Sequence, residues 1–157
     1  MTQRVATMST EASPVIVKMK FRSGPLAVRA ALAHIVSELQ PMNWSKEDLG
    51  TVEIVLAEAL NNIVEHAYTG EDVAGPIAID CRAQTSALHV RIIDDGHPMP
   101  DEQPPELTEA NLDMDLLDLP EGGFGWYLIR KLANDVEYRR ENNQNVLDLH
   151  LALAASA

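Results

Sequence analysis

Polar side chains recur at every fourth residue along a segment that is otherwise apolar, LAEALNNIVEHAY (residues 56–68). At about 100° per residue in an α-helix, Glu58, Asn62 and His66 share one face. The opposite stripe is apolar and suits packing against a sheet. It contains Leu56, Ala59, Leu60, Ile63 and Ala67. The pattern therefore predicts a helix that is anchored on one side and presents a carboxylate, a carboxamide and an imidazole on the other.

Upstream of this segment, the spacing of apolar residues predicts one strand and two helices. Residues 15–21 (VIVKMKF) alternate as a half-buried strand does. A helix should run from Pro25 to about Gln40, since proline suits the first helical turn. Ser45 followed by Asp48 is a capping arrangement for the next helix, which carries the polar face and should end near Tyr68.

Downstream, residues 77–83 and 88–94 read as a β-hairpin, and periodicity is then lost from residue 95 to residue 121. Helical spacing returns from Gly125, and VEYRR and NVLDLHLALA form a closing hairpin. The order of elements predicts an α+β fold, a two-layer sandwich with helices on one face of a mostly antiparallel mixed sheet. Residues 1–13 are expected to be a disordered lead-in, and residues 14–157 a single domain.

Composition and charge exclude several classes of function. The net charge of -12 repels a phosphate backbone, so direct binding of nucleic acid is not expected. No apolar run approaches the roughly 20 residues that span a bilayer, and residues 1–14 contain no apolar core of a signal peptide. Cys81 is the only cysteine, which favours a reducing compartment. We therefore expect a cytoplasmic protein that does not bind membranes.

A second polar group lies where a predicted strand ends, in IIDDGHPMP (residues 92–100). Asp94 would be held by the strand at the edge of the aperiodic loop, a position that suits ligand recognition. A buried carboxylate there could accept a hydrogen bond from the exocyclic amine of a purine. An ordinary Asp-Gly turn through Gly96 explains the same residues. Similarly, the polar helical face could be solvated, with no ligand.

A third group is EGGFGWYLIRK (residues 121–131), where Gly122, Gly123 and Gly125 precede a helix. Free backbone N–H groups at a helix start can bind phosphate. The segment has neither the Walker sequence nor the Rossmann fingerprint. A flexible hinge before a helix is the alternative interpretation. The preceding loop is acidic and proline-rich and contains no lysine or arginine between residues 95 and 121.

Taken in order, these three groups resemble the motifs of the bacterial anti-sigma factor serine/threonine kinases, which have the histidine-kinase-like ATPase (Bergerat) fold. EALNNIVEHAY is similar to their N box, DDGHPMP to their first glycine box and GGFGWYLIRKLANDVEY to their second. The resemblance extends from about residue 15 to residue 153. It implies ATP and Mg²⁺ as cofactors and a nucleotide lid at about residues 97–121.

The resemblance also implies a role for each residue of the three boxes. Glu58 would be the catalytic general base, and Asn62 would coordinate Mg²⁺. Asp94 would receive the adenine amine, and Gly96 would let the backbone approach the ring. The remaining nucleotide-binding positions are His66 in the N box and Gly122, Gly123 and Gly125 beside the phosphates.

The function that the resemblance implies is a protein kinase that phosphorylates an anti-anti-sigma (STAS-type) protein and, when free, sequesters a sigma factor. Members of the family commonly dimerise, so a homodimer is also expected. A non-catalytic module that binds nucleotide or a partner is the alternative. A catalytic fragment of a sensor histidine kinase fits less well, because no spare helix carries a phospho-acceptor histidine. His34 lies within the first predicted helix.

Overall fold

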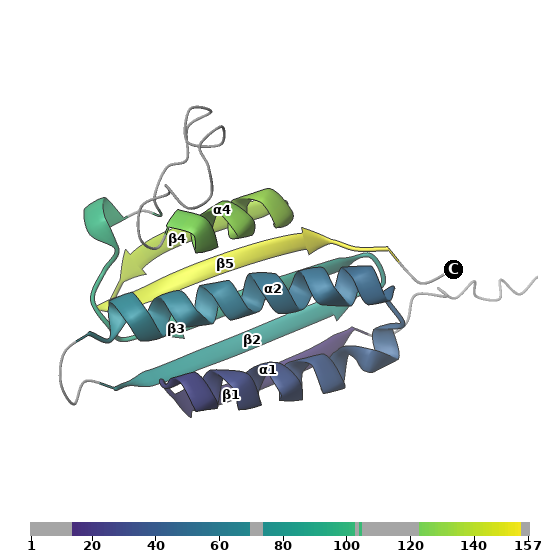
Figure 1. Cartoon of the computed structure of the whole chain (residues 1–157), viewed down its shortest axis with the longest axis horizontal. Coiled ribbons are helices and arrows are strands. Elements are labelled where there is room, and N and C mark those ends of the chain that lie inside the picture. The colour runs from purple at the N-terminus through teal and green to yellow at the C-terminus, as the bar shows by residue number, and fades with distance from the viewer. Residues whose placement is uncertain (1–13, 70–73, 103, 105–122, 155–157) are drawn as a thin grey trace, which may run out of the picture.

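The protein forms one sheet and a layer of helices (Figure 1). The structure is a computed structural model that describes residues 14–69, 74–102, 104 and 123–154. Its elements, in chain order, are β1 (Val15–Arg22), α1 (Pro25–Leu39), η1 (Gln40–Met42), α2 (Lys46–Asn62), η2 (Ile63–Ala67), β2 (Pro76–Gln84), β3 (Ala87–Asp94), η3 (Pro100–Glu102), α4 (Gly123–Leu132), β4 (Asp135–Glu141) and β5 (Gln144–Ala152).

The bounds of these elements agree with the sequence periodicity to within two residues, except in two helices. Helix α2 changes to a π-helical turn at Ile63, and α4 ends at Leu132 although helical spacing continues to Val136. The predicted lead-in and most of the predicted lid lie outside the described residues. No helix among those described combines the length and the apolar character that crossing a membrane requires.

The sheet has the strand order β1-β2-β3-β5-β4, and all four neighbouring pairs are antiparallel. The prediction of a mostly antiparallel sheet is confirmed, although the described strands include no parallel pair of the kind a mixed sheet would contain. The three α-helices cover a single face of the sheet, as predicted for a two-layer sandwich (Figure 1). Strand β5, the last in sequence, lies between β3 and β4.

The core lies between the helices and the covered face of the sheet. Alternate residues of each central strand point inward, as in Val90 and Ile92 of β3 and Leu147 and Leu149 of β5, all of them buried. Burying one such aliphatic side chain contributes about 1.5–3 kcal/mol. Because inward positions recur at every second residue, Asn145 of β5 also points to the covered face.

The start of α2 is fixed by the cap that the sequence predicts. The hydroxyl of Ser45 accepts a hydrogen bond from the backbone N–H of Asp48 at 3.1 Å. Just before it, the indole of Trp44 donates to the carbonyl of Thr85 at 2.9 Å, which ties the helix start to the β2–β3 turn. These contacts fix where α2 begins along the sheet, and they therefore also fix where its polar residues lie relative to the ends of the strands.

The α-helix ends at Asn62, earlier than the periodicity predicts, and continues as the π-helical turn η2. The backbone N–H of Tyr68 donates to the carbonyl of Ile63 at 3.1 Å, which closes the wider turn. The carbonyl of Ala67 accepts a hydrogen bond from the N–H of His97 at 2.8 Å. The wider turn therefore brings the end of the helix against the residues that follow β3.

The face of the sheet opposite the helices carries an ion-pair cluster around Asp148, whose side chain is 4% exposed. His89, Arg91 and Arg139 each donate to this carboxylate at 2.9 Å. Burial opposes ionisation of Asp148, but the three sets of hydrogen bonds outweigh it and lower its pKa from 3.8 to about 2. The cluster links β3, β5 and β4.

We expect Asp148→Asn to lower the free energy of unfolding at pH 7 by about 2 kcal/mol, the value of a pKa lowered by nearly two units. The carboxylate stabilises the fold fully above pH 4, and the effect is lost as the pH falls toward 2, because the folded pKa is the lower one. Urea unfolding at pH 7 and at pH 3 tests this. Asp135→Asn, at an exposed position on the same sheet face, is the control. Equal losses in the two variants would contradict the prediction.

Candidate functional site

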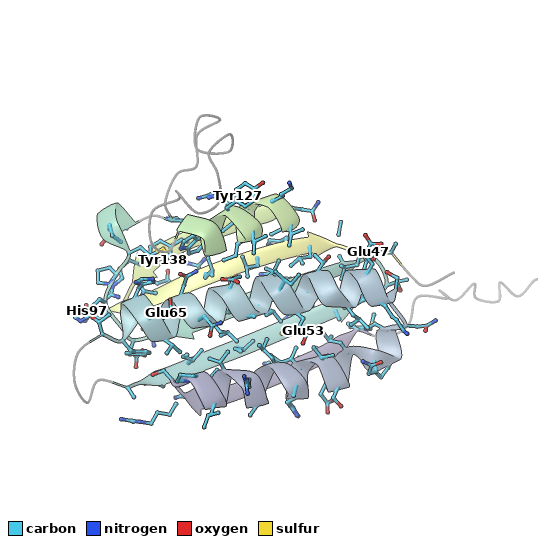
Figure 2. All side chains as sticks on the ribbon, in the orientation of Figure 1. Glu47, Glu53, Glu65, His97, Tyr127 and Tyr138 are labelled. Atoms are coloured by element: carbon cyan, nitrogen blue, oxygen red, sulfur yellow. The ribbon has the colours of Figure 1, made fainter. Side chains whose placement is uncertain are left out.

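A cavity of about 370 Å³ opens at the end of the molecule where α2, α4 and the ends of β3 and β5 meet. Figure 2 shows His97 and Tyr138 at this end, whereas Glu47 at the start of α2 lies at the other. The volume is in the range of small-molecule sites. Apolar side chains that include Ile63, Met99, Trp126 and Leu147 form much of its wall, and its polar residues are Asn62, His66, Asp94, His97, Tyr138 and Asn145.

Asp94 is the buried carboxylate of the cavity, with 3% of the residue exposed. Its Oδ1 accepts from the N–H of Gly96 at 2.9 Å and from Nδ2 of Asn145 at 2.8 Å. Burial raises the pKa of this carboxyl, and these hydrogen bonds and nearby Arg140 oppose the rise. The group predicted to read a base is thus rigidly held in the cavity wall.

Gly96 lies where the chain leaving β3 meets the backbone of η2. A Cβ at this position would lie 2.5 Å from the carbonyl oxygen of Ala67 and 2.7 Å from its carbonyl carbon. Only glycine allows so close an approach. The close contact that glycine permits here is with the protein's own backbone, and the approach of Gly96 to an adenine ring stays a prediction.

Asn62 and Glu58 lie one turn apart on α2 and meet the start of α4. A Cβ on Gly125 would lie 2.7 Å from Oε2 of Glu58 and 3.4 Å from Nδ2 of Asn62. Asn62 is 9% exposed and also lines the cavity, whereas Glu58 lies beyond it and is not among the lining residues. The N-box helix and the second glycine segment, 60 residues apart in sequence, thus converge.

The helical pattern alone allowed the amide of Asn62 to face solvent, but the amide is buried. Its Nδ2 is buried and has no hydrogen-bond partner among the described residues. A buried polar atom without a partner costs free energy, and a ligand that offers an acceptor to Nδ2 would remove this cost. Because rotation of the amide by 180° exchanges Nδ2 and Oδ1, the group can offer either a donor or an acceptor at this point.

The remaining predicted residues are placed as follows. His66 lines the cavity, but its half-exposed imidazole also lies 3.8 Å from the carboxylate of Glu65. Gly123 is the first residue of α4, and Gly125 is buried in its first turn. Gly122 lies outside the described residues.

Neither of the two basic residues of α4 lines the cavity. Arg130 and Lys131 are both exposed in the last turn. The ammonium of Lys131 lies 5.5 Å from the centre of the Tyr127 ring and donates to its hydroxyl at 3.3 Å. Of the described residues that line the cavity, none is a lysine or an arginine.

Sequence reasoning missed the contribution of the β4–β5 hairpin. Asn145, Tyr138 and Arg140 form a hydrogen-bonded group behind Asp94. A signal existed for Asn145, since it shares the inward parity of Leu147, Leu149 and Leu151 and is the one polar member of that series. Tyr68 was also missed: its hydroxyl donates to Pro76 and accepts from the N–H of Asp95, both at 2.7 Å.

These residues fit a nucleoside triphosphate with Mg²⁺. Asp94 offers an acceptor for a base, and the buried amide of Asn62 offers an oxygen ligand or a donor toward phosphates. The start of α4 supplies backbone N–H groups beside them. The types of donor and acceptor therefore agree with those that a base, a metal ion and phosphates require.

The comparisons with known proteins agree with this geometry. Residues 21–151 match the family model described as histidine kinase-like ATPase domain. The serine-protein kinases RsbW of Bacillus thuringiensis (strain Al Hakam) and of Bacillus cereus (strain AH820) are each 29% identical over 121 residues, which is 76% of this chain and 72% of theirs.

Among solved structures, one titled as the RsbU and RsbW domains of Rv1364c from Mycobacterium tuberculosis superposes with a TM-score of 0.58 at 15% identity. The match covers 93% of this chain and 35% of that one. The likeness shows a shared fold. Because the family model spans most of the sequence, the chain belongs to the histidine kinase-like ATPase domain family, which implies ATP binding.

Proposed function

We propose that this protein is an ATP-dependent serine/threonine kinase of the anti-sigma type, which phosphorylates a STAS-type anti-anti-sigma protein and binds a sigma factor when free. Two observations support it: the similarity to the RsbW serine-protein kinases over most of the chain and the three motifs that surround one cavity. Pairing of two copies stays a prediction.

The observation that carries the proposal is the convergence of Glu58 and Asn62 on Gly125. Phosphoryl transfer depends mainly on positioning and on compensation of charge, with little covalent chemistry by the protein. Glu58 would take the proton of the substrate hydroxyl. The closeness of its carboxylate to the second glycine segment supports a position beside the predicted phosphates. The absence of a Cβ at Gly125 leaves room for this carboxylate.

Asn62 would hold Mg²⁺ through its side-chain oxygen. No group of three or more His, Cys, Asp or Glu among the described residues is arranged to hold a metal. Mg²⁺ commonly needs only one or two protein ligands when substrate phosphates and water supply the rest. When bound, the ion would neutralise charge on the phosphates.

Asp94 would accept a hydrogen bond from the adenine amine, and Asp94→Asn tests this. We expect ATP affinity to fall about tenfold. The variant replaces a charged carboxylate oxygen, which accepts from the adenine amine, with an amide N–H, which is itself a donor and faces that amine. Calorimetric titration with ATP and with ITP, which has a carbonyl in place of the amine, measures the change. Preference should move toward ITP. Asp95→Asn, at the exposed neighbour, is the control and should leave ATP affinity unaltered; unchanged affinity in Asp94→Asn would refute the assignment.

The kinase activity itself is tested by incubating the protein with Mg²⁺, ATP labelled at the γ-phosphate and each STAS-type protein of the source organism. We expect label on one of them as an acid-stable phosphoserine or phosphothreonine. An acid-labile product would indicate phosphohistidine and the sensor-kinase reaction. A protein that binds ATP but transfers label to none of them would contradict the kinase proposal.

One observation favours the second candidate, a non-catalytic module that binds nucleotide or a partner. Because the described part of the cavity has no lysine or arginine, and Lys131 lies over Tyr127, no basic side chain there compensates the charge of a transferring phosphate. This candidate predicts that partner binding survives Glu58→Ala and Asn62→Ala unchanged. Strict dependence of partner binding on ATP would argue against it.

A further inference from the structure

The two oxygens of the Asp94 carboxylate have different surroundings. Both hydrogen bonds that Asp94 receives end on Oδ1, one from the N–H of Gly96 and one from the amide of Asn145. Within the described part of the chain, no group donates to Oδ2. Because Asp94 is buried and lines the cavity, Oδ2 is the atom left to accept a hydrogen bond from a ligand.

Asn145 is itself held by partners on every side. Its Nδ2 donates to Asp94 and, at 2.9 Å, to the carbonyl of His97. Its Oδ1 accepts from the hydroxyl of Tyr138 and from Nη1 of Arg140 at 3.1 Å. An amide has two N–H donors and an oxygen with two lone pairs, so all of its hydrogen-bonding capacity is used.

Arg140 determines which way this amide points. A guanidinium has only donors, so it can face Oδ1 of Asn145 but never Nδ2. The opposite orientation would also place Oδ1 against the carboxylate of Asp94, with two acceptors in contact. Arg140 is fixed in turn by a hydrogen bond of 2.7 Å to the carbonyl of Gly96. Arg140 of β4 therefore fixes the orientation of the Asn145 amide on β5, and this amide in turn holds Asp94 at the end of β3.

We propose that Asn145 is the positioning residue for base recognition. By engaging Oδ1 of Asp94 in an orientation that Arg140 fixes, it leaves Oδ2 as the acceptor that selects an exocyclic amine. This inference rests on the proposed nucleotide site and adds to it a residue outside the three motifs. Asn145 does not act on the reacting phosphate; it acts through Asp94.

The same network positions the cavity wall next to the base. The hydroxyl of Tyr138 accepts from the N–H of Met99 at 3.1 Å, and Met99 lines the cavity. Asn145 therefore connects Asp94, which would read the base, to Met99 in the cavity wall through the hydroxyl of Tyr138. A change at Asn145 should alter the reading of the amine more than the binding of the phosphates, since Asn62 and Gly125 lie on other elements.

The test uses the full chain and two nucleotides, ATP and purine riboside triphosphate, which lacks the amine. We expect the wild-type protein to bind ATP about tenfold more tightly than the amine-free nucleotide. Asn145→Ala should weaken the binding of ATP by about the same factor. The affinity for the amine-free nucleotide should change by less than about twofold, so that the preference for ATP disappears. A purely structural role would weaken both nucleotides alike.

Gln144→Ala is the matched control. This side-chain amide also donates to a carboxylate at 2.8 Å, but the acceptor is Asp95 and the contact is exposed. It should not change the preference for ATP. Thermal unfolding of each variant reports whether the fold is kept. If Asn145→Ala does not fold, Tyr138→Phe removes one donor to Asn145 while keeping the ring, and it should reduce the preference about threefold, in the range of one neutral hydrogen bond.

The results separate the two proposals. Equal weakening of both nucleotides by Asn145→Ala, or no weakening of either, would overturn the role of Asn145 while the nucleotide site stands. A wild-type protein that binds neither nucleotide would overturn the site and the positioning role together. Loss of amine preference in Asn145→Ala, with the preference intact in Gln144→Ala, supports the inference.

Discussion

Replacing Glu58 with glutamine is expected to slow phosphoryl transfer by about 100- to 10,000-fold, the contribution of a general base. ATP affinity should change by less than about threefold, since binding energy comes from other residues. Glu58 lies outside the cavity lining but against Gly125, so under the proposal it meets the substrate hydroxyl without forming part of the nucleotide pocket. Single-turnover transfer of γ-labelled phosphate and calorimetric titration with ATP measure the two quantities.

Glu53→Gln provides the control on the same helix. Glu53 is exposed on α2, so its loss should leave the transfer rate unchanged (Figure 2). If Glu58→Gln transfers phosphate as fast as the wild type, Glu58 is not the base. If it instead loses ATP affinity in proportion to its loss of rate, Glu58 serves binding and the assignment of its role fails.

Gly96→Ala is expected to weaken ATP binding by about 30-fold or more and to destabilise the fold by about 2 kcal/mol. The added methyl group would meet the carbonyl of Ala67 at 2.5 Å, and a backbone atom cannot turn aside as a side chain can. Relief of the clash would move the chain after β3 away from η2. That shift would break the hydrogen bond from His97 to Ala67 and displace Gly96 N–H from Asp94.

Gly50→Ala tests whether any added methyl group has this effect. A Cβ on Gly50 would meet no atom within 4 Å, and the residue lies inside α2. Alanine there should stabilise the protein by up to about 1 kcal/mol, because it favours the helix. Urea unfolding and ATP titration of both variants give the comparison. A Gly96→Ala protein as stable and as competent for ATP as the Gly50→Ala protein would refute the argument.

Periodicity was sufficient to predict the order of elements and the layer arrangement. Alternation in VIVKMKF, IAIDCRA and LHVRIID follows burial on one face of the sheet, and each became the expected strand. The capping contact of Ser45 with Asp48 was also found from local sequence. These features depend on residues close together in the chain, where patterns are most informative.

The helical segment ends at Ala67, next to the predicted end at Tyr68, but helical spacing did not show that its last five residues form a π-helical turn. Helical spacing also left open an exposed polar face for Asn62, whose amide is in fact buried. Burial of one polar residue depends on what packs over it. The start of α4 packs over Asn62. Because α4 is far from α2 in the sequence, this contact could not be predicted from local patterns.

Sequence reasoning could not predict the hydrogen-bonded group that supports Asp94, because the prediction requires the order of the strands. The group consists of Asn145, Arg140 and Tyr138. These residues lie far from Asp94 in sequence and come close because β5 pairs with β3 and β4 pairs with β5. Sequence reasoning placed the hairpin correctly but gave no reason to set it beside β3. Pairing between distant strands is determined by the whole sheet and cannot be read from either strand alone.

The central place of β5 in the sheet has a consequence for how the protein is made. On the ribosome, β3 is complete long before its partner, and its free edge must wait for β5 to be synthesised. Pairing of such distant segments is slow and leaves strand edges open to other chains. Because β5 also contains Asn145, a nascent chain can form the hydrogen bond between Asn145 and Asp94 only after β5 has been synthesised.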